Sequence, residues 1–310
     1  MRQYTKIGIA ITLFVGLVIA KHIFHDEISR VCSWNIRFFG LIDDNKVESD
    51  VYYHYIGNYI KQIQPDILCL QEICSYKSIY HLEDLLTDYK LYVSDKVINQ
   101  NKQLMDKKGI KELISGIGDR NKDMGKVQFN VFLVRKHISV VDFRTIHPKL
   151  ICLKYIDKHT GKQISIYNCH FPSNFSGDNT DIREKVMMKL LKDIEYNKYK
   201  NVIITGDLNT VREYGELKKL KNDFVDIFNS PLAKNRDLGI TPIFTHVWDK
   251  NKNKINDIDD KYSQIDYFFV SPRLVSRVKD VYVDKTFCGQ NMGTVMSELS
   301  DHCLIVMDIT

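Results

Sequence analysis

The sequence predicts an α/β fold in which two packed sheets are flanked by helices. Strand-like apolar runs alternate with amphipathic helical patterns in the early part of the chain, and strand-like runs follow one another in the later part. The 310 residues contain no Pro/Gly/Ser-rich linker and no internal repeat, and 44% of them are hydrophobic. A chain of this length and composition can bury a sizeable core, so we expect one large domain.

The early part is predicted to run strand, helix, strand, helix. Residues 31–36 form a buried apolar strand, and residues 50–64 place apolar side chains on one helical face until Pro65 ends the helix. Residues 67–71 form a short continuous apolar run, which is typical of a strand buried on both faces. The helical pattern returns at residues 79–86.

Strands dominate the later part. A turn at residues 158–162 predicts a hairpin between the strand-like runs on either side of it. The amphipathic pattern of residues 181–196 predicts a helix. The strands expected in this part are residues 129–134, 149–156, 163–168, 202–205, 267–270 and 304–309.

The first twenty residues differ from the rest. Arg2 and Lys6 precede an uncharged run over residues 7–20, which ends in small and apolar residues at Ala20. This pattern is typical of a secretory signal peptide, and the run is short for a bilayer span, which needs about 20 apolar residues. We expect cleavage after Ala20, with an uncleaved membrane anchor as the alternative and a buried helix as a third reading. Either form of export places the domain of residues 28–310 in the periplasm or outside the cell, secreted or attached to the membrane.

The charge is mildly basic. Residues 1–20 carry two of the cations and no acid, so their removal would lower the formal charge from +5 to +3. Sequence-specific DNA binders usually show a stronger basic stripe, whereas transient contact with a phosphate backbone needs no more. The most basic segment, residues 101–126, contains seven Lys or Arg and four Gly. It reads either as a solvated surface loop or as a loop that follows substrate phosphates.

The seven cysteines include no CxxC pair and no zinc-type spacing. Five of them lie in apolar strand-like runs and are predicted to be buried free thiols: Cys32, Cys69, Cys152, Cys169 and Cys303. Cys74 and Cys288 lie in predicted loops and could pair in an exported protein.

Polar side chains recur where the apolar runs end, in segments spread from residue 33 to residue 302. They are Asn35 and Arg37 in WNIRFFG, Glu72 in LQE, His170 in NCHFPS, Asp207 and Asn209 in GDLN, Asp266 in QIDY, and Asp301 and His302 in SDH. Strand ends that meet at one edge could hold a hard metal ion and two histidines around a phosphate. The pattern therefore predicts a metal-dependent phosphodiesterase.

The order and spacing of these motifs over roughly residues 30–310 resemble the endonuclease/exonuclease/phosphatase superfamily and, within it, the deoxyribonuclease I branch. The resemblance implies a four-layer α/β/β/α sandwich of two packed, mainly antiparallel sheets flanked by helices. Loops at one end of the sheets would carry the site.

The resemblance also implies roles for the metal-binding and phosphate-binding residues. Glu72 would be the anchoring ligand for Mg²⁺, or for Mn²⁺ or Ca²⁺, with Asn35 supporting the ion and Asp301 close enough to ligate it. Arg37 would contact backbone phosphate, and Asn209 would hold a phosphate oxygen.

The remaining residues are expected to move protons. Asp207 would orient or deprotonate the attacking water, and His170 and His302 would act as catalytic imidazoles. Asp266 is the expected partner of His302, since a carboxylate on one ring nitrogen fixes the tautomer and raises the basicity.

Two positions depart from the deoxyribonuclease I pattern. Where that branch has a glutamate that orients the first histidine, the nearest counterpart is Gln128, which predicts either a less basic His170 or a partner for it elsewhere in the chain. After the QE motif the branch has an arginine that enters the minor groove, and this chain has Ile73 and Cys74. We therefore expect little sequence specificity, because phosphate contacts position a duplex without reading bases.

The expected function is that of an exported, divalent-metal-dependent endonuclease acting on DNA. The same motifs serve phosphodiesterases that act on phospholipids or phosphoinositides, such as sphingomyelinases, and an inactive binding member is a further alternative. Arg37, two residues after Asn35, favours the nuclease.

Overall fold

The computed structural model describes residues 29–39, 49–73, 76–94, 128–174, 177–211, 215–230, 243–248, 261–286 and 300–310. The expected signal or anchor, the basic segment 101–126, Cys74 and Cys288 lie outside these residues. None of the described helices is long and apolar enough to cross a membrane.

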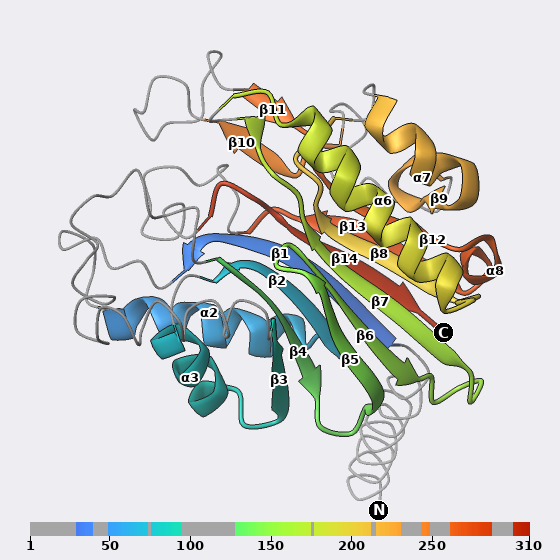
Figure 1. Cartoon of the computed structure of the whole chain (residues 1–310). Helices are drawn as coiled ribbons and strands as arrows, with labels where there is room; N and C mark the ends of the chain where they lie inside the picture. Colours follow the sequence, from blue (N-terminus) through green and yellow to red (C-terminus); the bar gives the residue numbers. More distant parts are fainter. Residues whose placement is uncertain are drawn as a thin grey trace, which may run out of the picture.

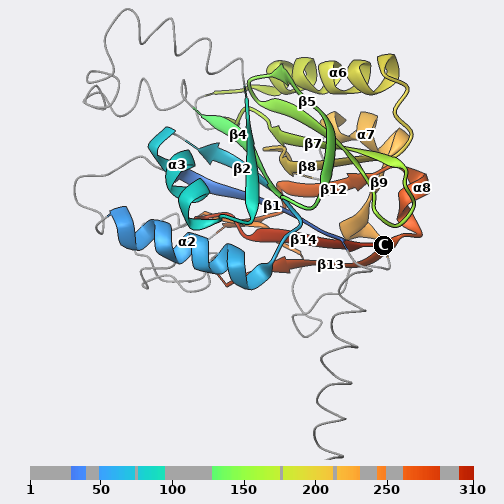
Figure 2. The same ribbon diagram turned by 90° about the horizontal axis from the view of Figure 1, so that it is seen from below.

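Two six-stranded sheets stack face to face, and helices cover the outer face of each sheet (Figures 1 and 2). In the first sheet the strand order is β13-β14-β1-β2-β4-β3. Its strands are β1 (Ser29–Phe39), β2 (Ile67–Ile73), β3 (Tyr89–Val93), β4 (Phe129–Arg135), β13 (Val278–Asp284) and β14 (Leu304–Ile309).

The second sheet has the order β5-β6-β7-β8-β12-β9. Its strands are β5 (Ser139–His147), β6 (Leu150–Ile156), β7 (Gln163–His170), β8 (Val202–Asp207), β9 (Val225–Asp226) and β12 (Asp266–Val270). The short strands β10 (His246–Trp248) and β11 (Lys261–Ser263) form a separate hairpin.

Three apolar layers hold the sandwich together. Helices α2 (Ser49–Ile63) and α3 (Tyr76–Leu85) pack on the outer face of the first sheet, where the core includes Trp34, Ile56 and Leu82. Helices α6 (Thr180–Tyr196) and α7 (Lys218–Asp223) cover the second sheet. Between the sheets lies a layer that includes Phe132 and Phe268. The expected α/β/β/α sandwich is confirmed.

Strand pairing brings distant motifs to one edge. Strands β1 and β2 are parallel, with Asn35 opposite Gln71, so both carboxyl ends point the same way. Strands β7 and β8 are also parallel, with His170 opposite Asp207, and antiparallel β12 places Asp266 opposite Asp207. Because β12 runs in the reverse direction, its first residue meets the last residue of β8.

The expected elements occur with shifted ends, and several strands were missed. The helix expected at residues 50–64 spans Ser49–Ile63, and the one expected at residues 79–86 spans Tyr76–Leu85. Strands β3, β5 and β13 were not expected, because β3 and β5 leave most side chains partly exposed and β13 mixes buried with exposed positions. Their sequences therefore lack a continuous apolar run.

One cysteine prediction was wrong. Cys32, Cys69, Cys152 and Cys169 are free and buried as expected, whereas Cys303 is disulfide-bonded. An apolar strand-like run does not distinguish a buried thiol from a buried disulfide.

Candidate active site

Asp207 lies at the centre of a buried polar cluster where β1, β2, β7 and β8 end. Its Oδ2 accepts hydrogen bonds from Nδ2 of Asn35 and from Nδ2 of Asn209, each over 3.0 Å. The same oxygen lies 3.8 Å from Nε2 of His302 and 4.0 Å from Nε2 of His170. The two histidines therefore flank one carboxylate, which is 1% exposed.

The turn after β8 holds this carboxylate in place. The backbone N–H of Asn209 donates to Asp207 Oδ1 over 2.8 Å, and its side-chain amide also donates to the carbonyl of Phe171. Gly206 has φ +125°, and a Cβ there would lie 2.0 Å from the carbonyl oxygen of Cys169. No other residue fits at this close approach of β8 to β7.

Three residues around the cluster have strained backbone conformations. Arg37, Glu72 and Asn209 have φ values of 41°, 60° and 49°, in the left-handed region that non-glycine residues seldom adopt. Such residues persist only where surrounding contacts hold them, and they concentrate at functional sites.

Glu72 joins the cluster through Asn35 and His170. Its Oε1 lies 3.2 Å from Asn35 Nδ2, which donates to it, and 3.4 Å from His170 Nε2. The side-chain oxygen of Asn35 accepts the backbone N–H of Arg37 over 3.0 Å. Asn35 thus turns its N–H groups toward both carboxylates, and its expected support of a metal ion would use the second lone pair of that oxygen.

His302 is held by Asp266, as the sequence suggested. Nδ1 of His302 lies 2.9 Å from Asp266 Oδ2, which also accepts the hydroxyl of Thr245 over 2.8 Å. The Thr245 hydroxyl in turn accepts the backbone N–H of Asp266. Burial alone lowers the pKa of His302, but the carboxylates of Asp266 and Asp207 outweigh it and raise the pKa to about 10.

His170 is less basic, as expected, and its partner at Nδ1 is Lys149 rather than Gln128. Nζ of Lys149 lies 3.0 Å from Nδ1 of His170, and Gln128 Oε1 accepts a hydrogen bond from that same Nζ. An ammonium group only donates, so Nδ1 accepts and Nε2 carries the proton of a neutral ring. Burial, reinforced by the Lys149 charge, holds the pKa of His170 well below its usual range.

Asp207 has an unusual protonation equilibrium. Burial raises the pKa of its carboxyl to about 7, with Asp266 adding to the effect and the positive charge on His302 opposing it. At neutral pH the site therefore pairs a charged imidazole with a carboxyl group close to its midpoint. Active sites commonly hold titratable groups with pKa values displaced toward the working pH.

Asp301 lies at the more open side of the cluster. Its side chain is 27% exposed, and its oxygens lie 3.5 Å from Nε of Arg37 and 3.9 Å from Nε2 of His302. Burial raises the pKa of Asp301, but the Arg37 charge and the two neighbouring histidines hold it below its usual range. Arg37 is half exposed, so it can reach a substrate phosphate.

His246 is a site residue that the sequence did not single out. Its Nε2 lies 3.9 Å from Asp301 Oδ2, and its ring centroid is 4.7 Å from that of His302. Burial and the charge on His302 lower the pKa of His246 to about 4, so the ring is neutral. The signal available was a histidine beside Thr245 in the FTHVW segment, which matched no expected motif.

The donor atoms fit a divalent cation. Within the described residues, His246, Asp301 and His302 each place a ligand atom within 4.8 Å of the others, and so do Asp207, Asp266 and His302. Glu72 belongs to neither group, and its Oε1 lies 3.2 Å from Nδ2 of Asn35, which also donates to Asp207. Carboxylate oxygens suit hard ions such as Mg²⁺, whereas the imidazoles of the first group also suit transition metals.

A buried polar layer between the sheets supports the strand ends. Nε2 of Gln71 donates to Asn168 Oδ1 over 2.8 Å, and Nδ2 of Asn168 donates to the carbonyls of Leu70 and Val131. Both side chains are fully buried. This layer links β2 to β4 and β7 directly beneath the residues of the site.

Comparisons with known proteins agree with this geometry. The sequence matches the model of the Endonuclease/Exonuclease/phosphatase family over residues 32–302. No curated protein sequence matches the chain. Since the structural matches below are all under 25% identical in sequence, they show the fold alone.

Three solved structures illustrate the likeness. An endonuclease/exonuclease/phosphatase from Bacteroides vulgatus is 16% identical, with a TM-score of 0.64 and coverage of 91% of this chain and 98% of that one. Truncated Caenorhabditis elegans TDP2 is 21% identical, with a TM-score of 0.59 and coverage of 91% and 97%. D. rerio TDP2, complexed with single strand DNA product, is 16% identical, with a TM-score of 0.58 and coverage of 91% and 99%.

The family match runs from β1 to the SDH segment and encloses every site residue described above. The chain belongs to the endonuclease/exonuclease/phosphatase family.

Proposed function

We propose that this protein is an exported, divalent-metal-dependent endonuclease that hydrolyses DNA phosphodiester bonds with little sequence specificity. The observation that carries the proposal is the position of Asp207, whose buried Oδ2 lies within 4.0 Å of Nε2 of both His302 and His170. A carboxylate between two imidazoles can serve water activation and phosphate stabilisation in one small volume.

Asp207 and His302 have complementary roles. With a pKa raised to about 7, Asp207 can accept a proton from the attacking water at neutral pH. His302, with a pKa of about 10, remains an imidazolium and can stabilise charge on the phosphate or protonate the leaving oxygen. Asp266 and Thr245 fix the orientation of the ring.

His170 has a different role from His302. Because Lys149 occupies Nδ1, the ring presents an Nε2–H toward the side of the cluster that contains Glu72 and Asp207. Such a group donates a hydrogen bond to a phosphate oxygen rather than taking up a proton. Asn35 and Asn209, which already donate to Asp207, are placed to orient that carboxylate or a phosphate oxygen.

A metal ion would be held by Glu72 and Asp301, with Asn35 in support. A bound Mg²⁺, Mn²⁺ or Ca²⁺ would supply neutralisation of charge on the phosphate. Glu72 and Asp301 support this assignment, because they supply charged oxygen ligands of the kind that hard cations prefer.

DNA is the substrate best supported. One structural neighbour was captured with a single-stranded DNA product, and half-exposed Arg37 beside the cluster can contact a backbone phosphate. The chain has Ile73 and Cys74 where related enzymes reach into the minor groove, so base reading at that position is not expected.

Export rests on two observations. Residues 1–20 have the pattern of a signal peptide, and Cys303 is disulfide-bonded, which is typical of proteins in oxidising compartments. Sequencing the N-terminus of the exported protein tests cleavage after Ala20.

A side-by-side assay tests the substrate. The purified protein is offered supercoiled plasmid, single-stranded DNA and sphingomyelin, each with Mg²⁺ and with EDTA. We expect nicking of DNA that requires the metal and no release of phosphocholine. Hydrolysis of sphingomyelin without DNA cleavage would assign the site to a lipid phosphodiesterase, and binding without turnover of either would indicate an inactive member.

A further inference from the structure

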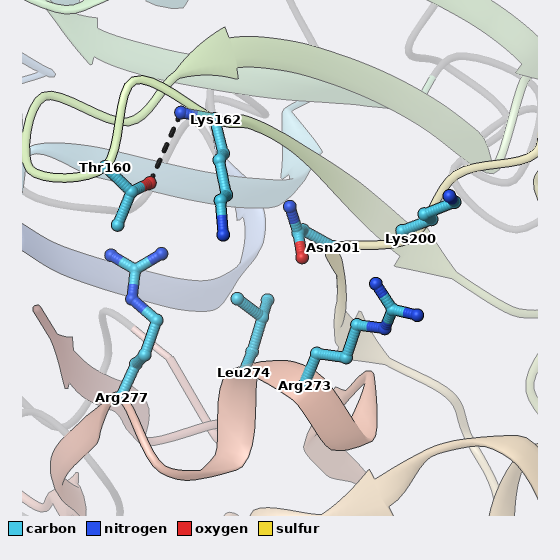
Figure 3. A pocket seen from close by; sticks show the side chains of 7 residues that line it. All are labelled: Thr160, Lys162, Lys200, Asn201, Arg273, Leu274 and Arg277. Atoms are coloured by element: carbon cyan, nitrogen blue, oxygen red, sulfur yellow. Dashed lines mark hydrogen bonds between the residues drawn. The ribbon is translucent and has the colours of Figure 1, made fainter.

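A basic pocket lies at the end of the second sheet that is remote from the candidate active site. The cavity has a volume of about 280 Å³ and is lined by Thr160, Lys162, Lys200, Asn201, Arg273, Leu274 and Arg277. These residues come from the turn between β6 and β7, from the segment before β8, and from helix α8 (Pro272–Val275) with the residues after it. Figure 3 shows the Lys162, Arg273 and Arg277 side chains extending into the space around Asn201 and Leu274.

The pocket carries an excess of positive charge. Arg277 is compensated, because its guanidinium pairs with Asp157 over 2.9 Å and also contacts the carbonyl of Thr310. Within the described residues, no acidic side chain pairs with Lys162, Lys200 or Arg273. Three cations around one cavity repel one another, and an anion in the cavity would relieve that repulsion.

The pocket floor adds a neutral donor that suits a phosphate. Asn201 and Thr160 line the cavity beside the cations, but the Thr160 hydroxyl donates its proton to Asp157 and so leaves Asn201 as the neutral donor. Asn201 donates one amide proton to the carbonyl of Gln163 and retains a second donor. Charged donors around a compact cavity are typical of phosphate recognition.

The location separates this pocket from the catalytic chemistry. Strand β8 begins at Val202, next to Asn201 of the pocket, and ends at Asp207 of the active site. At 3.3 Å per residue, Asn201 and Asp207 therefore lie about 20 Å apart. A phosphate held in the pocket is therefore not one undergoing hydrolysis. We propose that the pocket is a second anion-binding site, which takes a phosphate-bearing group of headgroup size and does not belong to the path of the nucleic acid.

Two occupants share this chemistry, a soluble phosphate ester and an anionic lipid headgroup. The position of the N-terminal end of β1 makes the lipid headgroup accessible to the pocket. Strand β1 enters the domain at Ser29, opposite Ile309, and the neighbouring Thr310 N–H donates to the carbonyl of Arg277. Residues 21–28 would span at most about 30 Å when extended. If residues 7–20 stay in a membrane, a tether of this length keeps the pocket end of the domain within reach of the bilayer.

The test compares two variants that lose the same charge. The pocket variant is Lys162→Ala/Lys200→Ala/Arg273→Ala, which leaves the Arg277–Asp157 pair intact. The control is Lys185→Ala/Lys189→Ala/Lys192→Ala, which removes three exposed cations from α6. Inorganic phosphate is titrated against thermal unfolding in EDTA at constant ionic strength, so that no bound metal ion recruits phosphate to the active site.

We expect phosphate to raise the melting temperature of the parent and of the α6 control, and to bind the pocket variant at least about tenfold more weakly. A flat response in the parent, or an equal loss in both variants, would overturn the proposal. The melting temperatures without phosphate show whether the pocket variant is folded.

Vesicle binding and DNA cleavage complete the test. Binding to phosphatidylcholine vesicles with and without phosphatidylserine distinguishes a lipid headgroup from a soluble phosphate ester. If the occupant is a headgroup, binding to the phosphatidylserine vesicles should be roughly 100-fold weaker in the pocket variant alone. If the occupant is soluble, none of the proteins should bind these vesicles. With Mg²⁺, both variants should cleave plasmid at the same rate. A loss of DNA cleavage confined to the pocket variant would place the pocket in the nucleic-acid path and overturn the proposal.

Discussion

Nζ of Lys149 lies 3.0 Å from Nδ1 of His170, so a cation contacts the nitrogen for which the resemblance suggests a carboxylate partner. A carboxylate there would raise the basicity of the ring, whereas the ammonium lowers it and fixes the proton on Nε2. The two imidazoles beside Asp207 are thereby differentiated: His302 is charged and His170 is neutral at neutral pH.

Lys149→Met should move the His170 step of the pH–rate profile, which lies on the acid side of the Asp207 step, to higher pH. Removing the ammonium takes away one of the causes that lower the pKa of His170, although burial, the larger cause, remains. Neutral His170 is the active form in this account, so cleavage activity is lost as the pH falls through the pKa of His170. A higher pKa of His170 therefore means that activity is lost at a higher pH. Initial rates of DNA cleavage against pH measure this, with Lys189→Met on α6 as the control.

Gln128→Glu provides a second check on the same contact. A carboxylate at this position would pair first with Lys149 Nζ, which Gln128 already contacts, and would act on His170 only through that pair. The His170 step of the pH–rate profile should therefore move less than in Lys149→Met. A larger shift in Gln128→Glu would mean that residue 128 orients His170 directly.

Asp266→Asn should lower the rate by about 10²- to 10⁴-fold, the usual contribution of an acid–base group. The carboxylate of Asp266 is the largest cause raising the pKa of His302, so its loss should move the alkaline limb down from about 10. The pH–rate profile of this variant reports the shift, and exposed Asp84→Asn on α3 is the matched control. An unmoved alkaline limb would assign that limb to another group.

Glu72→Ala should weaken metal binding and leave the fold intact. Its carboxylate lies beside Asn35 and His170 at the end of β2, and loss of a charged oxygen ligand removes much of the affinity for a hard cation. Binding of Mn²⁺ followed by electron paramagnetic resonance should shift to higher concentration, in parallel with the Mg²⁺ dependence of cleavage. Glu195→Ala on α6 should change neither, and an unshifted Mn²⁺ titration in Glu72→Ala would remove Glu72 from the metal site.

Asn168→Leu should destabilise the domain by about 3 kcal/mol, because it leaves buried partners without hydrogen bonds. Those partners are the carbonyls of Leu70 and Val131 and the amide of Gln71. Urea unfolding measures the change, with exposed Asn58→Leu on α2 as the comparison. Equal midpoints for the two variants would show that the layer between the sheets contributes little.

The sequence was sufficient to predict the motif-bearing strands, because the apolar runs of β1, β2, β7 and β8 contain or lead into polar motif residues and the β14 run follows the SDH motif. It was not sufficient for His170, whose neighbour at Nδ1 is Lys149, a residue immediately before β6 and outside every motif. The contribution of His246 depends likewise on a bridge to His302 across 56 residues of chain. Contacts of this kind are set by the packing of two sheets, which periodicity does not encode.

The partial exposure of some strands explains the other gaps. In β5 every side chain is at least partly exposed, so its pattern resembles a polar loop rather than a strand. The pKa values of Asp207 and His302 could not be predicted either, since they depend on burial and on distances between residues from β8, β12 and the SDH segment.

The central claim is that Asp207 is the base of a metal-dependent phosphodiesterase site, and the pH–rate profile of plasmid nicking by Asp207→Asn tests it most directly. In the parent with saturating Mg²⁺, the rate should rise with pH through the ionisation of Asp207, at or below the value of about 7 in the metal-free protein, because a bound cation favours the carboxylate. In the variant, the rate should fall by about 10²- to 10⁴-fold and the step assigned to Asp207 should disappear, leaving the His170 step at lower pH, with the urea midpoint retained. A variant that nicks plasmid at the parent rate with an unchanged acid limb would contradict the account.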